Sequence, residues 1–251
     1  VGQLDFGDFV SVAGIADALI NGGNTDLEPP SSWRAELATD LRFSGGAALS
    51  LTLSYDDITD AQDLVLLTVP NPTEDPLDPD DDFIRFDAPG NIGDAERLQL
   101  TVNYSQPISF IPGGRLTIAG YLRESEVTDP VTGELRTLSY TPESQIELNF
   151  RQDVPNHRFA WGFSVFKESE IEAYRFNEID VSEEGPWVDI WAETTALPGD
   201  TRLRVYAANA FNGTINRDRR FFGPDRSGAF VRSDVRQRQF AQAPWLIVQL
   251  S

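Results

Sequence analysis

The sequence predicts an all-β fold in which antiparallel strands form part of a transmembrane β-barrel. Two observations carry this prediction. Segments of about ten residues alternate between apolar and polar side chains, which is the period of a strand with two different faces. The connections between these segments alternate between short turns and long polar loops, which is typical of barrels of the bacterial outer membrane.

The clearest alternation lies between Ser32 and Asp57. From Trp33 to Phe43 the odd-numbered residues form a mainly apolar face, and the even-numbered residues form a mainly ionic one. After the turn Ser44–Gly46, the odd-numbered residues from Ala47 to Tyr55 continue the apolar face. Two such strands joined by a short turn predict a hairpin. Their length and their terminal aromatic residues are those expected of strands that cross a membrane.

The same alternation recurs along the chain and predicts about ten strands. Further strands are predicted at 97–104, 115–123, 145–151, 159–165, 187–194, 202–207 and 245–250. Short turns are predicted at 111–114, 155–156 and 198–200, and long polar loops at 59–93, 129–136, 178–185 and 212–235. A single helical turn is predicted at 15–19. This order of connections puts the C-terminus on the side of the short turns, which is the periplasmic side in such barrels.

The composition excludes several classes of protein. A net charge of -20, from 40 acidic and 20 basic residues, argues against nucleic acid as a partner because phosphates would repel the chain. No apolar run is long enough for a membrane-spanning helix. With no cysteine and only His157, a disulfide framework and a multi-histidine metal centre are excluded. The sequence opens with Val1 and has no signal segment, so we expect it to begin after processing or inside a longer protein.

A water-soluble β-sandwich is the alternative fold, because its strands also alternate and also turn every ten or so residues. The charged residues at mid-strand favour the barrel, since a barrel has a polar lumen to accommodate them. These residues are Arg34, Glu36, Asp40, Arg42, Arg97, Arg115, Arg123, Glu147 and Arg151. Both folds stay open at this point, and the barrel is the preferred one.

Several segments resemble the C-terminal part of TonB-dependent outer-membrane receptors. Residues 21–33 are similar to the segment that introduces a late barrel strand in that family, with Pro30 where glutamate is usual. Residues 209–211, followed by an arginine-rich loop and a terminal alternating strand, are similar to the end of the family's barrel. Residues 86–93 and 129–134 resemble a proteobacterial branch of these receptors.

The resemblance implies a 22-stranded barrel, an N-terminal plug and a short segment that engages TonB. Residues 1–251 correspond to the barrel portion alone, and they stop at Ser251 where the family has a terminal aromatic residue. Two open sheet edges in lipid would leave backbone N–H and C=O groups unpaired, at a prohibitive cost in free energy. We therefore expect the remaining strands to come from missing chain or from a partner subunit. The other expected partners are outer-membrane lipid, lipopolysaccharide, and TonB through the absent plug.

Two sets of residues are candidate ligand-binding residues. Trp187 and Trp191 lie on the polar face of their predicted strand, where they could meet a substrate in the lumen or lie against a plug. The second set is Arg217, Arg219, Arg220 and Arg226. Guanidinium groups suit phosphate and carboxylate, so these arginines are candidates for an anionic ligand or lipopolysaccharide phosphates. Pairing with acidic residues that line the lumen is the equal alternative.

An acidic segment at 74–82 contains Asp78, Asp80, Asp81 and Asp82, whose carboxylates are weak candidates for binding Ca²⁺. Its prolines, and the lack of the fixed spacing of a calcium motif, favour a solvated loop instead. No nucleophile motif, phosphate loop or metal-ligand spacing is present. We therefore predict no catalytic residue and no cofactor.

Taken with the resemblance, these features predict a non-enzymatic protein of the bacterial outer membrane. The resemblance implies a receptor or transporter barrel that takes part in TonB-dependent uptake of a siderophore, a saccharide or a similar nutrient. Two alternatives stay open. One is a complete ten-stranded porin or outer-membrane enzyme, and the other is a soluble β-sandwich module that binds glycans.

Overall fold

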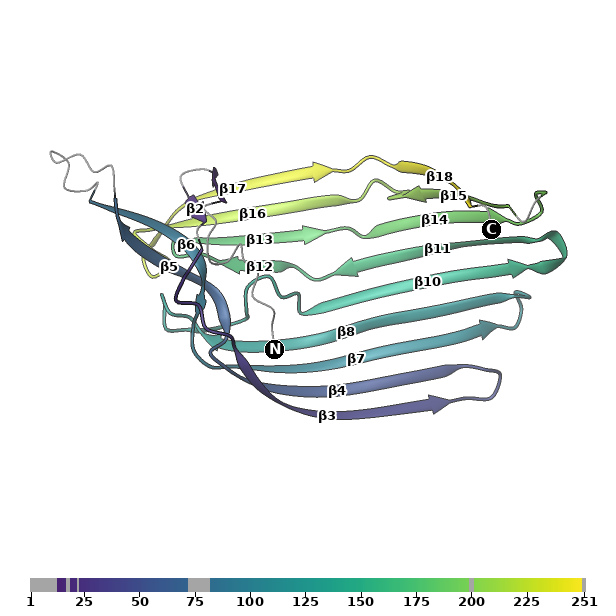
Figure 1. The fold of residues 1–251 in the computed structure, drawn as a ribbon, viewed down its shortest axis with the longest axis horizontal. Coiled ribbons are helices and arrows are strands. Elements are labelled where there is room, and N and C mark those ends of the chain that lie inside the picture. Colours follow the sequence, from purple (N-terminus) through teal and green to yellow (C-terminus); the bar gives the residue numbers. More distant parts are fainter. Residues whose placement is uncertain (1–12, 17–18, 22, 72–81, 199–200, 250–251) are drawn as a thin grey trace.

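The computed structural model describes residues 13–16, 19–21, 23–71, 82–198 and 201–249, which form an all-β structure (Figure 1). The strand pairs are antiparallel except for β2 with β6. The main sheet runs in the spatial order β3, β4, β7, β8, β10, β11, β14, β15 and β18, with β9 paired to β8. No helix in the described ranges has the length and apolar character needed to span a membrane.

The strands of the main sheet agree with most of the predicted ones. Their bounds are β3 (Ser31–Arg42), β4 (Ala48–Thr59), β7 (Ala95–Ile108), β8 (Gly114–Thr128), β9 (Leu135–Arg136), β10 (Ser144–Val154), β11 (Phe159–Glu168), β14 (Trp187–Thr194), β15 (Arg202–Ala208) and β18 (Ala243–Gln249). A 3-10 turn, η2 (Pro155–His157), joins β10 to β11. The short connections lie together at one end of the sheet, which we call the turn end, and the opposite end is the loop end (Figure 1).

The long connections are not irregular loops, and this part of the prediction is wrong. Residues 59–93 contain β5 (Gln62–Pro70) and β6 (Phe83–Asn91), which pair as a hairpin. Residues 171–184 contain β12 (Ile171–Tyr174) and β13 (Glu178–Glu184), and residues 214–239 contain β16 (Thr214–Gly223) and β17 (Ala229–Gln239). The predicted helical turn at 15–19 is also wrong, because β1 (Ala13–Ala16) and β2 (Leu19–Asn21) are strands.

For β13 and β16, the physical reason for the error is that these strands are rich in charged residues, which read as a polar loop in the sequence. In β13 and β16, Asp180 lies opposite Arg219 and pairs ionically with Arg217 at 2.5 Å. The charges are thus satisfied across the two strands, although the sequence has little apolar alternation there. β12, β13, β16 and β17 form a four-stranded sheet of their own at the loop end.

The main sheet has one apolar and one polar face. On seven successive strands, seven apolar or aromatic residues lie directly opposite one another: Leu41, Leu49, Tyr104, Ile118, Leu148, Val165 and Val188. The adjacent row on the other face reads Arg42, Ala48, Ser105, Thr117, Asn149, Ser164 and Asp189. The two-residue period of the sequence is therefore carried in register across the sheet.

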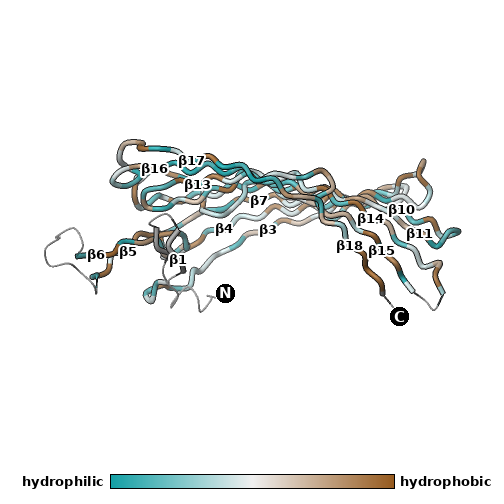
Figure 2. Tube along the Cα trace, turned by 90° about the horizontal axis from the view of Figure 1, so that it is seen from above, coloured by the Kyte–Doolittle hydropathy of each residue, from teal (hydrophilic) through white to brown (hydrophobic). Residues whose placement is uncertain are grey.

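Among the described residues, no second sheet covers the apolar face. Leu37, Leu122 and Val205 on this face keep 72%, 62% and 53% of their surface exposed. In the described ranges, the one cluster of buried apolar residues is Ala61, Ala95 and Val127 at the loop end. Seen from above, the main sheet is a single curved layer (Figure 2). This is not the packing of a β-sandwich, in which the apolar face forms the core.

The sheet is open. β3 and β18 are its two ends and do not pair with each other, so the described residues form no closed barrel. The β5–β6 hairpin lies on the concave side of the sheet at the loop end (Figure 2).

Candidate functional site

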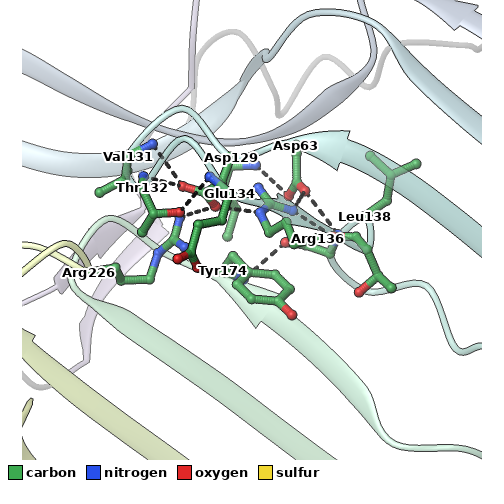
Figure 3. Close-up of polar contacts among 12 residues, drawn as sticks. Asp63, Asp129, Val131, Thr132, Glu134, Arg136, Leu138, Tyr174 and Arg226 are labelled. Carbon is green, nitrogen blue, oxygen red and sulfur yellow. Dashed lines mark hydrogen bonds and ion pairs between the residues drawn. The ribbon is translucent and has the colours of Figure 1, made fainter.

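Five residues from distant parts of the chain meet at the loop end and form what we call the loop-end ionic cluster: Asp63, Asp129, Arg136, Tyr174 and Arg226 (Figure 3). Asp129 is its centre. One carboxylate oxygen accepts hydrogen bonds from the N–H groups of Val131 and Thr132, at 2.8 and 3.0 Å. The other oxygen accepts from Arg136 at 2.5 Å and from Arg226 at 2.6 Å. Both oxygens of this buried carboxylate are therefore satisfied.

Arg136 joins two carboxylates. It donates to Asp129 and, at 2.7 Å, to Asp63 of β5. Its guanidinium lies over the ring of Tyr174, 4.4 Å from the centroid, and Arg226 lies 5.4 Å from the same centroid. Both arginines and both carboxylates are at most 6% exposed. Because each buried charge has a partner of opposite sign, the cluster avoids the high cost of an unpaired buried ion.

The cluster attaches the β5–β6 hairpin to the sheet. Asp63 of β5 also accepts the N–H of Ser139 at 2.9 Å. From β6, the buried carboxylate of Asp87 accepts the N–H of Phe176 at 3.0 Å and lies 3.7 Å from Arg175. Burial raises the pKa of Asp87 above its ordinary value. The hairpin is thus held at two points by segments that lie 73 to 89 residues away in sequence.

The ionised form of Asp129 is favoured by its surroundings. Burial disfavours the charge, but the hydrogen bonds from Thr132, Arg136, Arg226 and Val131 outweigh it and lower the pKa of Asp129 to about 2. In an unfolded chain the pKa of an aspartate is about 3.9. Asp129 therefore stabilises the folded state above pH ~4, and this contribution is lost as the pH falls towards 2.

We expect the wild-type protein to lose about 2 kcal/mol of unfolding free energy through Asp129 between pH ~4 and ~2. The measurement is guanidinium chloride unfolding of the full-length protein across this range, with Asp129→Asn as the comparison. The variant should be less stable at pH 4 and show a shallower loss on acidification. Asp87 contributes a slope of opposite sign, which both proteins share. Equal pH slopes in the two proteins would contradict this role of Asp129.

The four predicted arginines do not form one cluster. Arg226 belongs to the loop-end ionic cluster, whereas the other three lie on β16. Arg219 donates to the fully buried Glu178 at 2.5 Å, and Arg217 pairs with Asp180. Arg220 lies 3.8 Å from Asp218 and is 41% exposed. Each of the four therefore has an acidic partner, and a ligand-binding role for them stays a prediction.

The two predicted tryptophans have different surroundings. Trp187 packs against Phe240 with ring centroids 5.6 Å apart and against Gly213, where a Cβ atom would come within 2.9 Å of the indole. Trp191 lies on the polar face of β14 among charged side chains. Of the two, Trp191 is the one placed to meet a ligand on that face.

The predicted calcium loop lies almost entirely outside the described residues, which do not include Asp78, Asp80 and Asp81. Asp82 is described and exposed, and its carbonyl oxygen accepts the N–H of Asn71 at 2.9 Å. Among the residues that the structure describes, no three acidic or histidine side chains come together in an arrangement that could hold a metal ion.

A second group lies on the polar face near the turn end, and we call it the arginine–tryptophan platform: Arg151, Trp191, Glu193, Arg204 and Tyr206. Trp191 and Tyr206 are directly opposite each other on β14 and β15. The Arg204 guanidinium carbon lies 4.4 Å from the Trp191 ring centroid and 5.7 Å from that of Tyr206. Arg151 lies 5.1 Å from the Trp191 centroid and donates to Glu193 at 3.0 Å. Such stacking orders the guanidinium groups.

Gly162 on β11 makes room for this arrangement. It lies opposite both Arg151 and Trp191, and a Cβ atom at this position would come within 2.8 Å of the indole. The absence of a side chain lets the indole lie against the backbone of β11. The prediction that Trp191 lies on the polar face is confirmed. Its neighbours Arg151 and Arg204 could be identified only from the strand register.

No family model, curated protein or solved structure matches the chain. Its function is therefore inferred from its own geometry.

Proposed function

We propose that the chain is part of the wall of an outer-membrane β-barrel, of the TonB-dependent receptor type, that takes part in nutrient uptake. The single observation that carries the proposal is the apolar face of the main sheet. This face runs in register across seven strands and keeps large side chains such as Leu37 and Leu122 exposed. A contiguous exposed apolar surface of this extent requires an apolar partner. Lipid is such a partner for a sheet of this kind.

Aromatic residues at both ends of the apolar face support a lipid environment. Trp33 lies near the loop end and is 64% exposed. Phe110, Phe159 and Trp161 lie near the turn end and are 82%, 38% and 36% exposed. Aromatic side chains are enriched where a membrane meets water, because their rings combine an apolar body with a polar or polarisable edge.

The polar face of the main sheet has the polarity of a water-filled lumen. Arg34 and Arg97 both pair with Asp56, at 2.5 and 2.9 Å, and Arg123 donates to Gln99 at 2.9 Å. These pairs bridge neighbouring strands on the face opposite the apolar row. In a barrel, charged residues of this kind face the interior.

The open edges support a barrel that is completed by further strands. All residues of β3 are exposed, and so are all but one residue of β17. Unpaired backbone groups at such edges cannot be left in lipid. Because β3 and β18 do not pair, this arrangement favours a larger barrel over a complete ten-stranded porin.

A receptor is favoured over an open pore by the β5–β6 hairpin. The hairpin lies on the concave side (Figure 2), and buried ion pairs hold it there. In a barrel it would narrow the outer entrance and contribute to a surface that selects a ligand. Within this proposal the protein is a binding and import component and not an enzyme.

Single-cysteine labelling tests the membrane environment, because the chain has no cysteine of its own. Val102 and Asn103 are neighbours on β7 with side chains on opposite faces. Spin labels at Val102→Cys and Asn103→Cys are compared in the full-length protein reconstituted into phosphatidylcholine vesicles. We expect the first label to collide with oxygen dissolved in lipid and the second with an aqueous nickel chelate.

Two results would overturn the membrane proposal. One is that the protein stays in the aqueous fraction and does not float with the vesicles. The other is that the label at residue 102 is as accessible to the nickel chelate as the label at residue 103.

A further inference from the structure

We propose that the arginine–tryptophan platform binds a small organic anion, in which a carboxylate or phosphate is attached to a flat, apolar group. The inference deepens the proposed function and rests on it in one respect: it takes the polar face of the main sheet as the lining of the path that a nutrient follows.

Arg204 is a cation without an anion. Among the described residues, its guanidinium makes no ion pair and no hydrogen bond, and its Nε atom is buried without a partner. Glu193 lies directly opposite Arg204 on β14, but its carboxylate binds Arg151 instead. A guanidinium has five N–H donors, and withdrawing a donor from water without a new acceptor is costly. An anionic ligand would supply the missing acceptors in the bidentate geometry that arginine prefers.

The aromatic rings beside Arg204 indicate what else the ligand carries. Trp191, Tyr206 and Trp245 lie opposite one another on β14, β15 and β18, and Trp245 is 61% exposed. Tyr206 donates its hydroxyl hydrogen to Asp189, which orients its ring. A row of rings next to a cation suits a ligand that stacks a flat group while its charge meets the guanidinium.

The surroundings of the platform attract anions although the chain as a whole carries -20. Between the row that contains Asp189 and the turn end, the polar face of β8, β10, β11, β14 and β15 carries more basic than acidic residues. The basic residues are Arg115, Arg151, Arg202 and Arg204, and the acidic ones are Asp153 and Glu193. A hollow of about 330 Å³ lies next to the platform, and Arg151, Glu193 and Arg202 are among its lining residues. This volume is at the lower end of the range for small-molecule sites.

Lipid headgroups are a poor fit to this site. The platform lies on the face opposite the apolar row, so in a barrel it faces the lumen and not the bilayer. The ligand chemistry that remains is a carboxylate or a phosphate in solution, and the two are distinguished by separate probes.

The test is a calorimetric titration of the full-length protein with four probes: benzoate, phenyl phosphate, inorganic phosphate and the neutral analogue benzamide. We expect benzoate, phenyl phosphate or both to bind, and benzamide not to bind, because the charge is required. The probe that binds more tightly shows whether the site prefers a carboxylate or a phosphate. Arg204→Gln should weaken binding about tenfold or more, since a charged hydrogen bond is lost.

Two further variants separate this site from general attraction to arginine. Arg115→Gln is the matched control, because Arg115 lies in the same cross-strand row as Arg151 and donates to Ser105 at 3.2 Å. It removes one positive charge from the surroundings and none of the platform's own side chains, so it should weaken probe binding much less than Arg204→Gln does. Trp191→Leu should weaken the binding of benzoate or phenyl phosphate more than the binding of inorganic phosphate.

The proposal is overturned if neither aromatic anion binds, if benzamide binds equally well, or if Arg204→Gln and Arg115→Gln have the same effect. The spin labels on β7 report on the membrane environment independently. If the two spin labels differ as expected but no probe binds, the anion site is wrong and the barrel proposal stands. If the probes bind but the protein does not insert into lipid, the anion site stands and the barrel proposal is wrong.

Discussion

Arg136→Ala is expected to destabilise the loop end by about 3 to 5 kcal/mol, because it leaves two buried carboxylates without their shared cation. Arg136 pairs with Asp63 at 2.7 Å and with Asp129 at 2.5 Å. It also donates to the carbonyl oxygen of Thr137 at 2.8 Å. After the substitution, Asp63 loses its ion pair and keeps only the hydrogen bond from the N–H of Ser139 to hold β5 to this segment. The β5–β6 hairpin should then open more often than in the wild type.

Hydrogen exchange measures this opening at the backbone amides of β5 and β6. In Arg136→Ala their protection should fall sharply, while the amides of β10 and β11 keep theirs. Arg85→Ala is the control, since Arg85 lies on β6 but its side chain is exposed. We expect Arg85→Ala to change the stability of the hairpin by less than about 0.5 kcal/mol, as for most surface substitutions. Unchanged protection of β5 and β6 in Arg136→Ala would show that the ionic cluster does not hold the hairpin.

Leu100→Arg is expected to cost about 2 to 4 kcal/mol of stability in lipid, the penalty for an arginine on the lipid face of a barrel near the bilayer centre. Leu100 lies on the apolar face between Leu53 and Leu122 of the neighbouring strands. The measurement is reversible unfolding in guanidinium chloride of protein inserted in phosphatidylcholine vesicles.

Thr101→Arg is the matched control for this substitution. Thr101 is the next residue of β7, and its side chain lies on the polar face between Thr52 and Tyr121. An arginine there meets water in the proposed lumen, so its cost should stay below about 1 kcal/mol. If the two arginines destabilise the protein equally, the two faces do not differ in environment and the apolar face does not meet hydrocarbon.

The sequence predicts the fold best where the pattern is local. The alternation from Trp33 to Tyr55 predicts the β3–β4 hairpin and both of its faces, and the short turn at Ser44–Gly46 agrees with the register of Leu41 with Leu49. Side-chain direction in a strand depends only on residue parity, so this information is complete in the sequence.

The prediction fails where charges replace apolar alternation. Residues 178–184 and 214–223 are strands whose acids and arginines satisfy one another across the pair, as Glu178 and Arg219 do at 2.5 Å. A polar composition predicts a solvated loop unless the partner strand is known. Closure of a barrel, insertion in a membrane and nutrient uptake stay proposals.

The order of residues is enough to show that the chain is built of two-faced strands, that Trp191 lies on the polar face, and that the connections alternate in length. It does not show that Arg226 meets Asp129 across 97 residues, or that Arg204 lies between two aromatic rings while Glu193 binds Arg151. Those pairings come from the folded arrangement. The face of a side chain follows from local backbone geometry, whereas ionic partners depend on strand register and on how distant hairpins pack.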